Sequence, residues 1–95
     1  MTKTALVTGG TRGIGKAISL ALKEAGHTVV ANYAGNDDAA RAFTEETGIA
    51  TFKWSVADAD ACADGIRQVE SEVGPVDILV NNAGITRDGF MHKMS

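Results

Sequence analysis

The stretch TGGTRGIG, residues 8–15, decides the fold class of this chain. It follows a short apolar run at 4–8 that is typical of a β-strand, and it leads into apolar residues spaced three and four apart over 14–25. Glycines in this context allow a tight turn, close backbone approach to a phosphate, and helix amides directed at negative charge. The stretch therefore predicts a phosphate-binding loop. The glycines that meet these demands are Gly9, Gly13 and Gly15.

The alternative to phosphate binding is a purely structural role, in which the glycines only turn the chain and pack the helix against the strand. A Walker-type phosphate loop is excluded, because no Gly-Lys-Ser/Thr ends the segment. The nucleotide-binding interpretation is favoured because the loop joins a strand to a helix at the predicted switch point of the sheet, where successive strands begin to be added on the other side.

The rest of the chain continues the alternation of strands and helices. Three further β-type runs are expected at 28–32, 49–56 and 76–80, with amphipathic segments between them. Connections that contain a helix bring the next strand back in the same direction, so the strands are expected to be parallel. The predicted fold is α/β, a Rossmann-type doubly wound sheet with strand order 3-2-1-4. Its first two helices are expected on one face and its third on the other.

The helix boundaries are predicted from residues that favour caps. Gly26 is expected to end the first helix, and Gly48 the second. Asp37 or Asp38 is expected to cap the second helix. Asp58 is expected to cap the third helix, which Gly74-Pro75 stops.

Composition narrows the classes of protein and partner. The 95 residues are 44% hydrophobic and carry 9 basic against 12 acidic side chains, a net charge of -3. One core is possible at this size, and the acidic balance argues against nucleic acid as a partner. Cys62 is the single cysteine, and no Cys/His cluster has the spacing of a metal site. Without a signal-peptide or membrane-span pattern, we expect a cytoplasmic protein that binds neither membrane nor metal.

A second motif, Asn81-Asn82-Ala83-Gly84, closes the run at 76–80. In the predicted sheet it lies at the same edge as the glycine loop, because neighbouring parallel strands end there together. Thr-Gly-x-x-x-Gly-x-Gly after the first strand and Asn-Asn-Ala-Gly after the fourth resemble the short-chain dehydrogenase/reductase family, over residues 1–95. The resemblance implies a nicotinamide dinucleotide cofactor at this edge.

The resemblance also implies cofactor contacts from several segments. Asn82 would lie against the cofactor, with a purely structural role as the alternative. Ser55 and Val56, at the end of the third strand, would border the adenine, although many relatives have Asp or Asn in place of Ser55. Asp88 is the expected substrate neighbour, with a solvated loop carboxylate as the alternative. The expected cofactor contacts are Gly9, Arg12, Gly13, Ile14, Gly15, Ala34, Ser55, Val56, Asn82, Ala83, Gly84, Ile85 and Thr86.

The residues after the second strand bear on the choice between NADP and NAD. A carboxylate at the tip of this strand usually holds the free ribose of NAD, whereas a 2'-phosphate needs a cation instead. The tip at 31–34 has no acid, and Asp37 is expected to cap a helix. Arg12 is the expected phosphate partner, so NADP is predicted. NAD held through Asp37, and Arg12 as a solvated loop cation, remain alternatives.

Catalytic residues are not expected in this chain. Reduction of a ketone needs a proton donor and a cation that lowers its pKa, which in the family are the Tyr and Lys of Tyr-x-x-x-Lys, with an upstream Ser. The only tyrosine is Tyr33, and Asp37 stands four residues later. We therefore expect 1–95 to be the NADP-binding part of a single Rossmann-fold reductase domain, incomplete at its C-terminus.

The substrate class is implied by a closer resemblance, carried by 32–38, 53–58 and 84–94, to family members that reduce 3-oxoacyl thioesters. It implies an NADPH-dependent oxidoreductase acting on an acyl-CoA thioester, and a homotetramer as the full-length protein. A thioester of an acyl-carrier protein is the alternative substrate. A complete, non-catalytic nucleotide-binding module is the alternative function.

Overall fold

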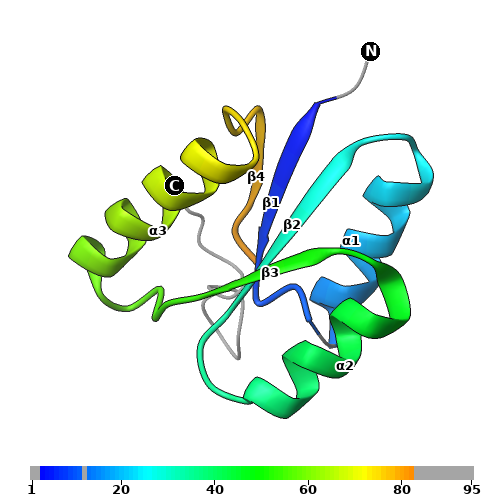
Figure 1. Cartoon of the computed structure of the whole chain (residues 1–95), viewed down its shortest axis with the longest axis horizontal. Helices are drawn as coiled ribbons and strands as arrows, with labels where there is room; N and C mark the ends of the chain where they lie inside the picture. Colours follow the sequence, from blue (N-terminus) through cyan, green and yellow to red (C-terminus); the bar gives the residue numbers. More distant parts are fainter. Residues whose placement is uncertain (1–2, 12, 83–95) are drawn as a thin grey trace.

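The computed structural model describes residues 3–11 and 13–82, which form one parallel sheet with helices on both faces (Figure 1). The described residues alternate strictly between strand and helix. The strands are β1 (Thr4–Thr8), β2 (Thr28–Tyr33), β3 (Ala50–Lys53) and β4 (Ile78–Val80). The helices are α1 (Gly13–Glu24), α2 (Asp37–Thr47) and α3 (Ala59–Glu72).

The strand order is β3-β2-β1-β4, and every neighbouring pair is parallel. This confirms the predicted α/β class and the predicted order. β1 is central, with Leu6 opposite Val30 of β2 on one side and Leu79 of β4 on the other. The change in direction of strand addition falls at β1 and β4, so their carboxyl ends form the edge where a ligand is expected.

The two faces of the sheet bury separate apolar clusters. On one face Val7, Val29 and Phe43 pack with residues of α1 and α2. On the other, Leu6 and Val30 pack with Val69 of α3. Successive residues of a strand point to opposite faces, so β1 and β2 supply both clusters. α1 and α2 therefore cover one face and α3 the other, as predicted (Figure 1).

Two strands are shorter than the apolar runs suggested. β3 ends at Lys53 because β2, its partner in the described sheet, ends at Tyr33, which is paired with Lys53. β4 begins at Ile78, and just before it the side chain of Asp77 accepts a hydrogen bond from the backbone N–H of Thr4 at 3.0 Å. Hydrophobicity continues past the residues that find a strand partner, so the predicted runs 49–56 and 76–80 were too long.

The helix caps were predicted correctly except at the start of α2. Asp58 caps α3 by accepting from the N–H of Ala61 at 3.1 Å, and Gly48 ends α2 with a left-handed φ of 77°. The cap of α2 is Asn36, whose side-chain oxygen accepts from the N–H of Ala39 at 3.0 Å. The prediction of Asp37 or Asp38 as the cap was wrong, because Asn36, just before them, already has the extended backbone and the acceptor that a cap requires.

Candidate cofactor-binding site

The glycine loop joins β1 to α1 through two left-handed residues. Gly9 and Gly13 each have a φ of 62°, a conformation in which other side chains are strained. Gly15 is needed for a different reason, because a Cβ there would lie 2.0 Å from the carbonyl oxygen of Gly9 and 2.7 Å from the Asn82 side-chain nitrogen. The three glycines thus set the path of the loop and its closeness to the second motif.

Asn32, the next-to-last residue of β2, ties the glycine loop to the residue that follows β3. Its side chain is 1% exposed; the Oδ1 accepts from the N–H of Gly9 at 3.3 Å, and the Nδ2 donates to the carbonyl of Trp54 at 3.0 Å. The backbone carbonyl of Asn32 also accepts from the N–H of Gly10 at 3.1 Å. The sequence analysis assigned no role to Asn32. A polar residue directly after the apolar run 29–31 was the one feature that could have indicated a structural role for its side chain.

Ser19 fixes the loop from the side of α1. Its hydroxyl is fully buried, 3.1 Å from the carbonyl oxygen of Gly10 and 2.9 Å from that of Gly15. Because a hydroxyl has one proton, the two carbonyls share it. This residue was also missed, since a serine in a helix is usually read as a surface position.

The second motif contacts the first through side chains. The Nδ2 of Asn82 donates to the carbonyl of Gly9 at 3.2 Å. The hydroxyl of Thr8 lies 3.3 Å from both the carbonyl oxygen of Val80 and the Oδ1 of Asn81. Gly9 and Asn82 are 73 residues apart in the sequence. The sheet brings them together at the carboxyl ends of β1 and β4. The hydrogen bond to Gly9 gives Asn82 the structural role that was its alternative. Its contact with a cofactor stays a prediction.

The N-terminus of α1 faces outward with small or apolar residues. Ile14 is 67% exposed, and a Cβ built on Gly13 would meet nothing within 4 Å. The first turn of α1 contains no acidic residue. Backbone amides at a helix N-terminus attract anions, and the open backbone at Gly13 allows a diphosphate to approach. The loop therefore fits the diphosphate of a dinucleotide in both shape and charge.

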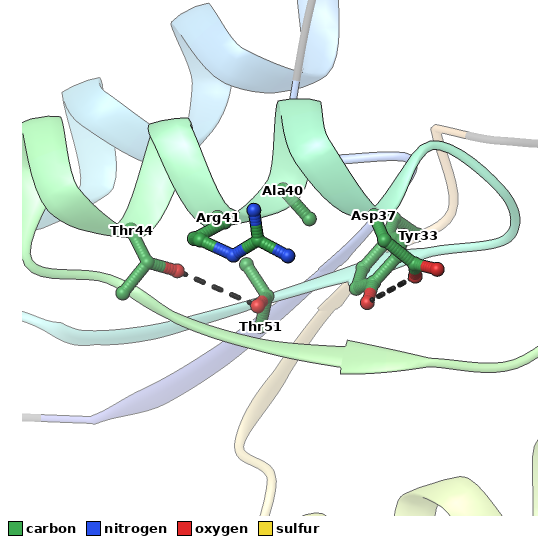
Figure 2. Close-up of a pocket in the computed structure, with 6 residues that line it drawn as sticks. All are labelled: Tyr33, Asp37, Ala40, Arg41, Thr44 and Thr51. Atoms are coloured by element: carbon green, nitrogen blue, oxygen red, sulfur yellow. Dashed lines mark hydrogen bonds between the residues drawn. The ribbon is translucent and has the colours of Figure 1, made fainter.

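A small polar cluster lies beyond the end of β2. The hydroxyl of Tyr33 donates to the Oδ1 of Asp37 at 3.0 Å, and the Nζ of Lys53 lies 3.2 Å from the same oxygen. Figure 2 shows Tyr33 and Asp37 at one end of a pocket beneath α2, with Arg41 over its middle. The pocket measures about 480 Å³ and is also lined by Ala40, Thr44 and Thr51.

The cluster shifts the ionisation of both of its acids. The hydrogen bond from Tyr33, helped by that from Lys53, holds the pKa of the Asp37 carboxyl below its usual 3.8. The same bond, followed by desolvation and by the negative charge of Asp37, raises the pKa of the Tyr33 phenol above its usual 10.0. Asp37 is therefore an ion-paired carboxylate at neutral pH, and Tyr33 is a neutral donor.

Ser55 and Val56 lie in a turn between β3 and α3. The prediction that they end the third strand is wrong, for the reason of strand pairing given above. The hydroxyl of Ser55 accepts from the N–H of Ala57 at 3.2 Å, and Val56 is among the exposed large apolar residues. Their predicted contact with adenine is left untested by this arrangement.

Several predicted site residues fall outside the described part of the chain, and their roles stay predictions. They are Arg12, Ala83, Gly84, Ile85, Thr86 and Asp88. Ala34 is described and exposed, in the bend after β2. Within residues 3–11 and 13–82, no group of three or more His, Cys, Asp or Glu side chains is arranged to hold a metal ion. No helix in that same part is long and apolar enough to cross a bilayer.

Comparison with known proteins establishes the family. The profile of the short chain dehydrogenase family matches residues 3–95, and the chain belongs to that family. An acetoacetyl-CoA reductase from Paracoccus denitrificans is 78% identical over all 95 residues, which cover 39% of its length. A 3-oxoacyl-acyl-carrier-protein reductase from Staphylococcus aureus is 50% identical over 99% of this chain and 40% of its own. The chain thus spans about two fifths of the length of these relatives.

A solved structure shares the fold. A blue fluorescent protein from a metagenomic library, in complex with NADPH, superposes with a TM-score of 0.80. It is 36% identical, and the match covers 90% of this chain and 37% of that one. The Rossmann-type arrangement predicted from the sequence is therefore also present in a solved structure that is 36% identical to this chain.

Proposed function

We propose that these 95 residues are the NADP-binding part of a longer reductase that converts acetoacetyl-CoA to (R)-3-hydroxybutyryl-CoA with NADPH. The observation that carries the proposal is the 78% identity to an acetoacetyl-CoA reductase over the whole chain. The glycine loop supports it, because its open backbone and helix N-terminus suit a dinucleotide diphosphate.

The chain's own residues would bind and orient the cofactor. The amides of Gly13 to Gly15 would donate to the diphosphate, and Arg12 would pair with the 2'-phosphate. Asn82 would hold the loop at Gly9 while the backbone at Ala83 and Gly84 passes the nicotinamide side. Bound NADPH supplies the hydride for the substrate carbonyl. The remaining proposed contacts are Ile14, Ala34, Ser55, Val56, Ile85 and Thr86, with Asp88 near the substrate.

The proton for the new alcohol is proposed to come from residues outside these 95. Tyr33 is unsuited to the role, because its hydroxyl is held by Asp37 and its pKa is raised. A general acid in this reaction needs a neighbouring cation that lowers its pKa, as the lysine of Tyr-x-x-x-Lys does in the family. The family pattern therefore points to a Ser and a Tyr-x-x-x-Lys beyond Ser95.

Measuring the activity of the full-length protein tests the proposal. Consumption of NADPH and NADH would be followed with acetoacetyl-CoA and with the acetoacetyl thioester of an acyl-carrier protein. Higher kcat/KM for acetoacetyl-CoA with NADPH supports the proposal, and equal or better use of NADH contradicts the cofactor. Sequencing the reading frame beyond Ser95 gives a second test, because an in-frame stop would favour a non-catalytic nucleotide-binding module.

Reduction of a 3-oxoacyl-acyl-carrier-protein thioester is the second candidate function. It is favoured by the 50% identity to a reductase named for that substrate. A higher kcat/KM for the carrier-protein thioester would select it over the first. For either function we extend the proposal to a cytoplasmic homotetramer, and for the first to a role in polyhydroxybutyrate synthesis. Light scattering on the full-length protein tests the assembly.

A further inference from the structure

The cluster at the end of β2 contains a carboxylate close to where a dinucleotide ribose is expected. Asp37 is the first residue of α2, four residues after Tyr33 ends β2. β2 is bound to the glycine loop, since the N–H of Gly10 donates to the carbonyl of Asn32 at 3.1 Å. In dinucleotide-binding folds a carboxylate near this point accepts hydrogen bonds from the free 2'-hydroxyl of NAD, and it repels the 2'-phosphate of NADP.

The geometry gives this carboxylate other partners. Its Oδ1 accepts from the Tyr33 hydroxyl at 3.0 Å, and the Lys53 Nζ lies 3.3 Å from its Oδ2. Tyr33 and Lys53 are paired across β2 and β3, so the sheet register sets both donors on one carboxylate. Arg41, one turn further along α2, pairs with Asp38 at 3.1 Å and adds positive charge on the same side.

We propose that Tyr33 and Lys53 are specificity-determining residues for the cofactor, because they hold the Asp37 carboxylate away from the ribose and offset its charge. This proposal rests on the proposed preference for NADP. A carboxylate that already accepts from Tyr33 and Lys53 has fewer free lone pairs for a ribose hydroxyl, and its paired charge repels a 2'-phosphate less than a free one would. The chain can thus keep an acid after β2 and still prefer NADP.

Binding measurements on the full-length protein test the proposal. Titration calorimetry would give the dissociation constants for NADP⁺ and NAD⁺ with three proteins. They are the parent, the double variant Tyr33→Phe/Lys53→Met, and the triple variant that adds Asp37→Asn. The double variant frees the Asp37 carboxylate, so the preference of the protein for NADP⁺ over NAD⁺ is expected to fall about tenfold. Adding Asp37→Asn removes the freed charge and is expected to restore the parent preference.

A matched control separates this effect from the general loss of a surface ion pair. Lys16→Met removes the exposed pair with Glu46, which has a 3.0 Å separation, and is expected to leave the ratio of the two constants unchanged. The proposal is overturned if freeing Asp37 leaves the ratio within about twofold of the parent, a difference well under 1 kcal/mol. It is also overturned if the fall persists with Asp37→Asn, since Tyr33 or Lys53 would then act on the cofactor directly.

Failure of the proposed NADP preference would be seen in the parent protein, whereas failure of the roles of Tyr33 and Lys53 would be seen in the variants. If the parent protein itself binds NAD⁺ as tightly as NADP⁺, the proposed cofactor is wrong. The change of ratio between the parent and the freed variant still measures whether Tyr33 and Lys53 withhold the carboxylate. The two claims are therefore judged by different numbers in one titration series.

Discussion

The three helices in the described part of this chain begin in two different ways. α2 and α3 have side-chain caps, Asn36 and Asp58, and acids in their first turns. α1 begins at Gly13 after the glycine loop, and no acid lies in its first turn. Both arrangements answer the same problem, because the first amides of a helix lack partners and its N-terminus is positive. We infer that side chains of the protein satisfy the N-terminal amides of α2 and α3, whereas the N-terminal amides of α1 are left to bind the anion of a ligand.

Ile14→Asp would make α1 resemble the other two helices. The side chain is 67% exposed, so folding is expected to be unaffected or slightly favoured by the helix dipole. Affinity for NADP⁺ is expected to fall on the order of 100-fold, because the new carboxylate occupies the positive end and repels the diphosphate. Calorimetric titration and thermal unfolding of the full-length protein measure the two effects.

The matched control for this variant is Ile14→Asn, which adds polarity without charge. It is expected to weaken NADP⁺ binding much less than the Asp variant. Equal losses for Asn and Asp would mean that shape at this position matters and charge does not, which contradicts the comparison of the helices.

Asn32→Ala would remove the support of the loop that leads into α1. The variant leaves the N–H of Gly9 and the carbonyl of Trp54 without their side-chain partner inside the protein. The free energy of unfolding is expected to fall by about 2–3 kcal/mol, the cost of unpaired buried groups. Urea denaturation of the full-length protein measures it. The exposed Asn36→Ala is the comparison and is expected to cost about 1 kcal/mol as a lost cap; a larger cost for Asn36 would refute the assignment.

Asp58→Ala would strip α3 of its cap. The N–H of Ala61 loses its acceptor, so the free energy of unfolding is expected to fall by about 1 kcal/mol. Affinity for NADP⁺ is expected to stay within about twofold of the parent, because this N-terminus is proposed to serve the fold alone. A large loss of binding in the folded variant would place the cofactor near α3 and would break the comparison.

The pH dependence of the α2 cluster gives the smallest expected effect. The folded pKa of Asp37 is below its usual 3.8, so its pairing stabilises the fold above that pH and is lost as pH falls through the lowered value. The folded pKa of Tyr33 is raised, so its contribution is present below pH 10.0 and is lost as pH rises through the raised value. Carboxyl NMR titration should show the pKa of Asp37 rising toward 3.8 in Tyr33→Phe. An unchanged pKa would mean that the hydrogen bond from Tyr33 does not cause the lowered pKa of Asp37.

The sheet could be predicted from sequence because its determinants are local. Residues 4–8 were assigned correctly as a strand. The helix faces followed from the handedness of crossovers, and the strand order followed from the switch point expected of a doubly wound sheet. The ends of β3 and β4 could not be predicted, because they depend on where a partner strand stops. The cap of α2 was predicted one or two residues late, since Asn36, Asp37 and Asp38 are all good caps by residue type.

The glycines of the site could be predicted, and their supports could not. Gly9, Gly13 and Gly15 have a spacing that can be read from the sequence. Asn32 and Ser19 act through contacts that exist only once β2 and α1 have packed on the loop. The same limit applied to Asp37, whose two partners are set by the register of β2 and β3.

A crystal structure of the full-length protein with NADP⁺ tests the central claim most directly. We predict that diphosphate oxygens accept hydrogen bonds from the backbone amides of Gly13 to Gly15, and that the 2'-phosphate lies beside the bend after Tyr33. A cofactor with its diphosphate at the capped N-terminus of α2 or α3, or away from the carboxyl ends of β1 and β4, would contradict the account.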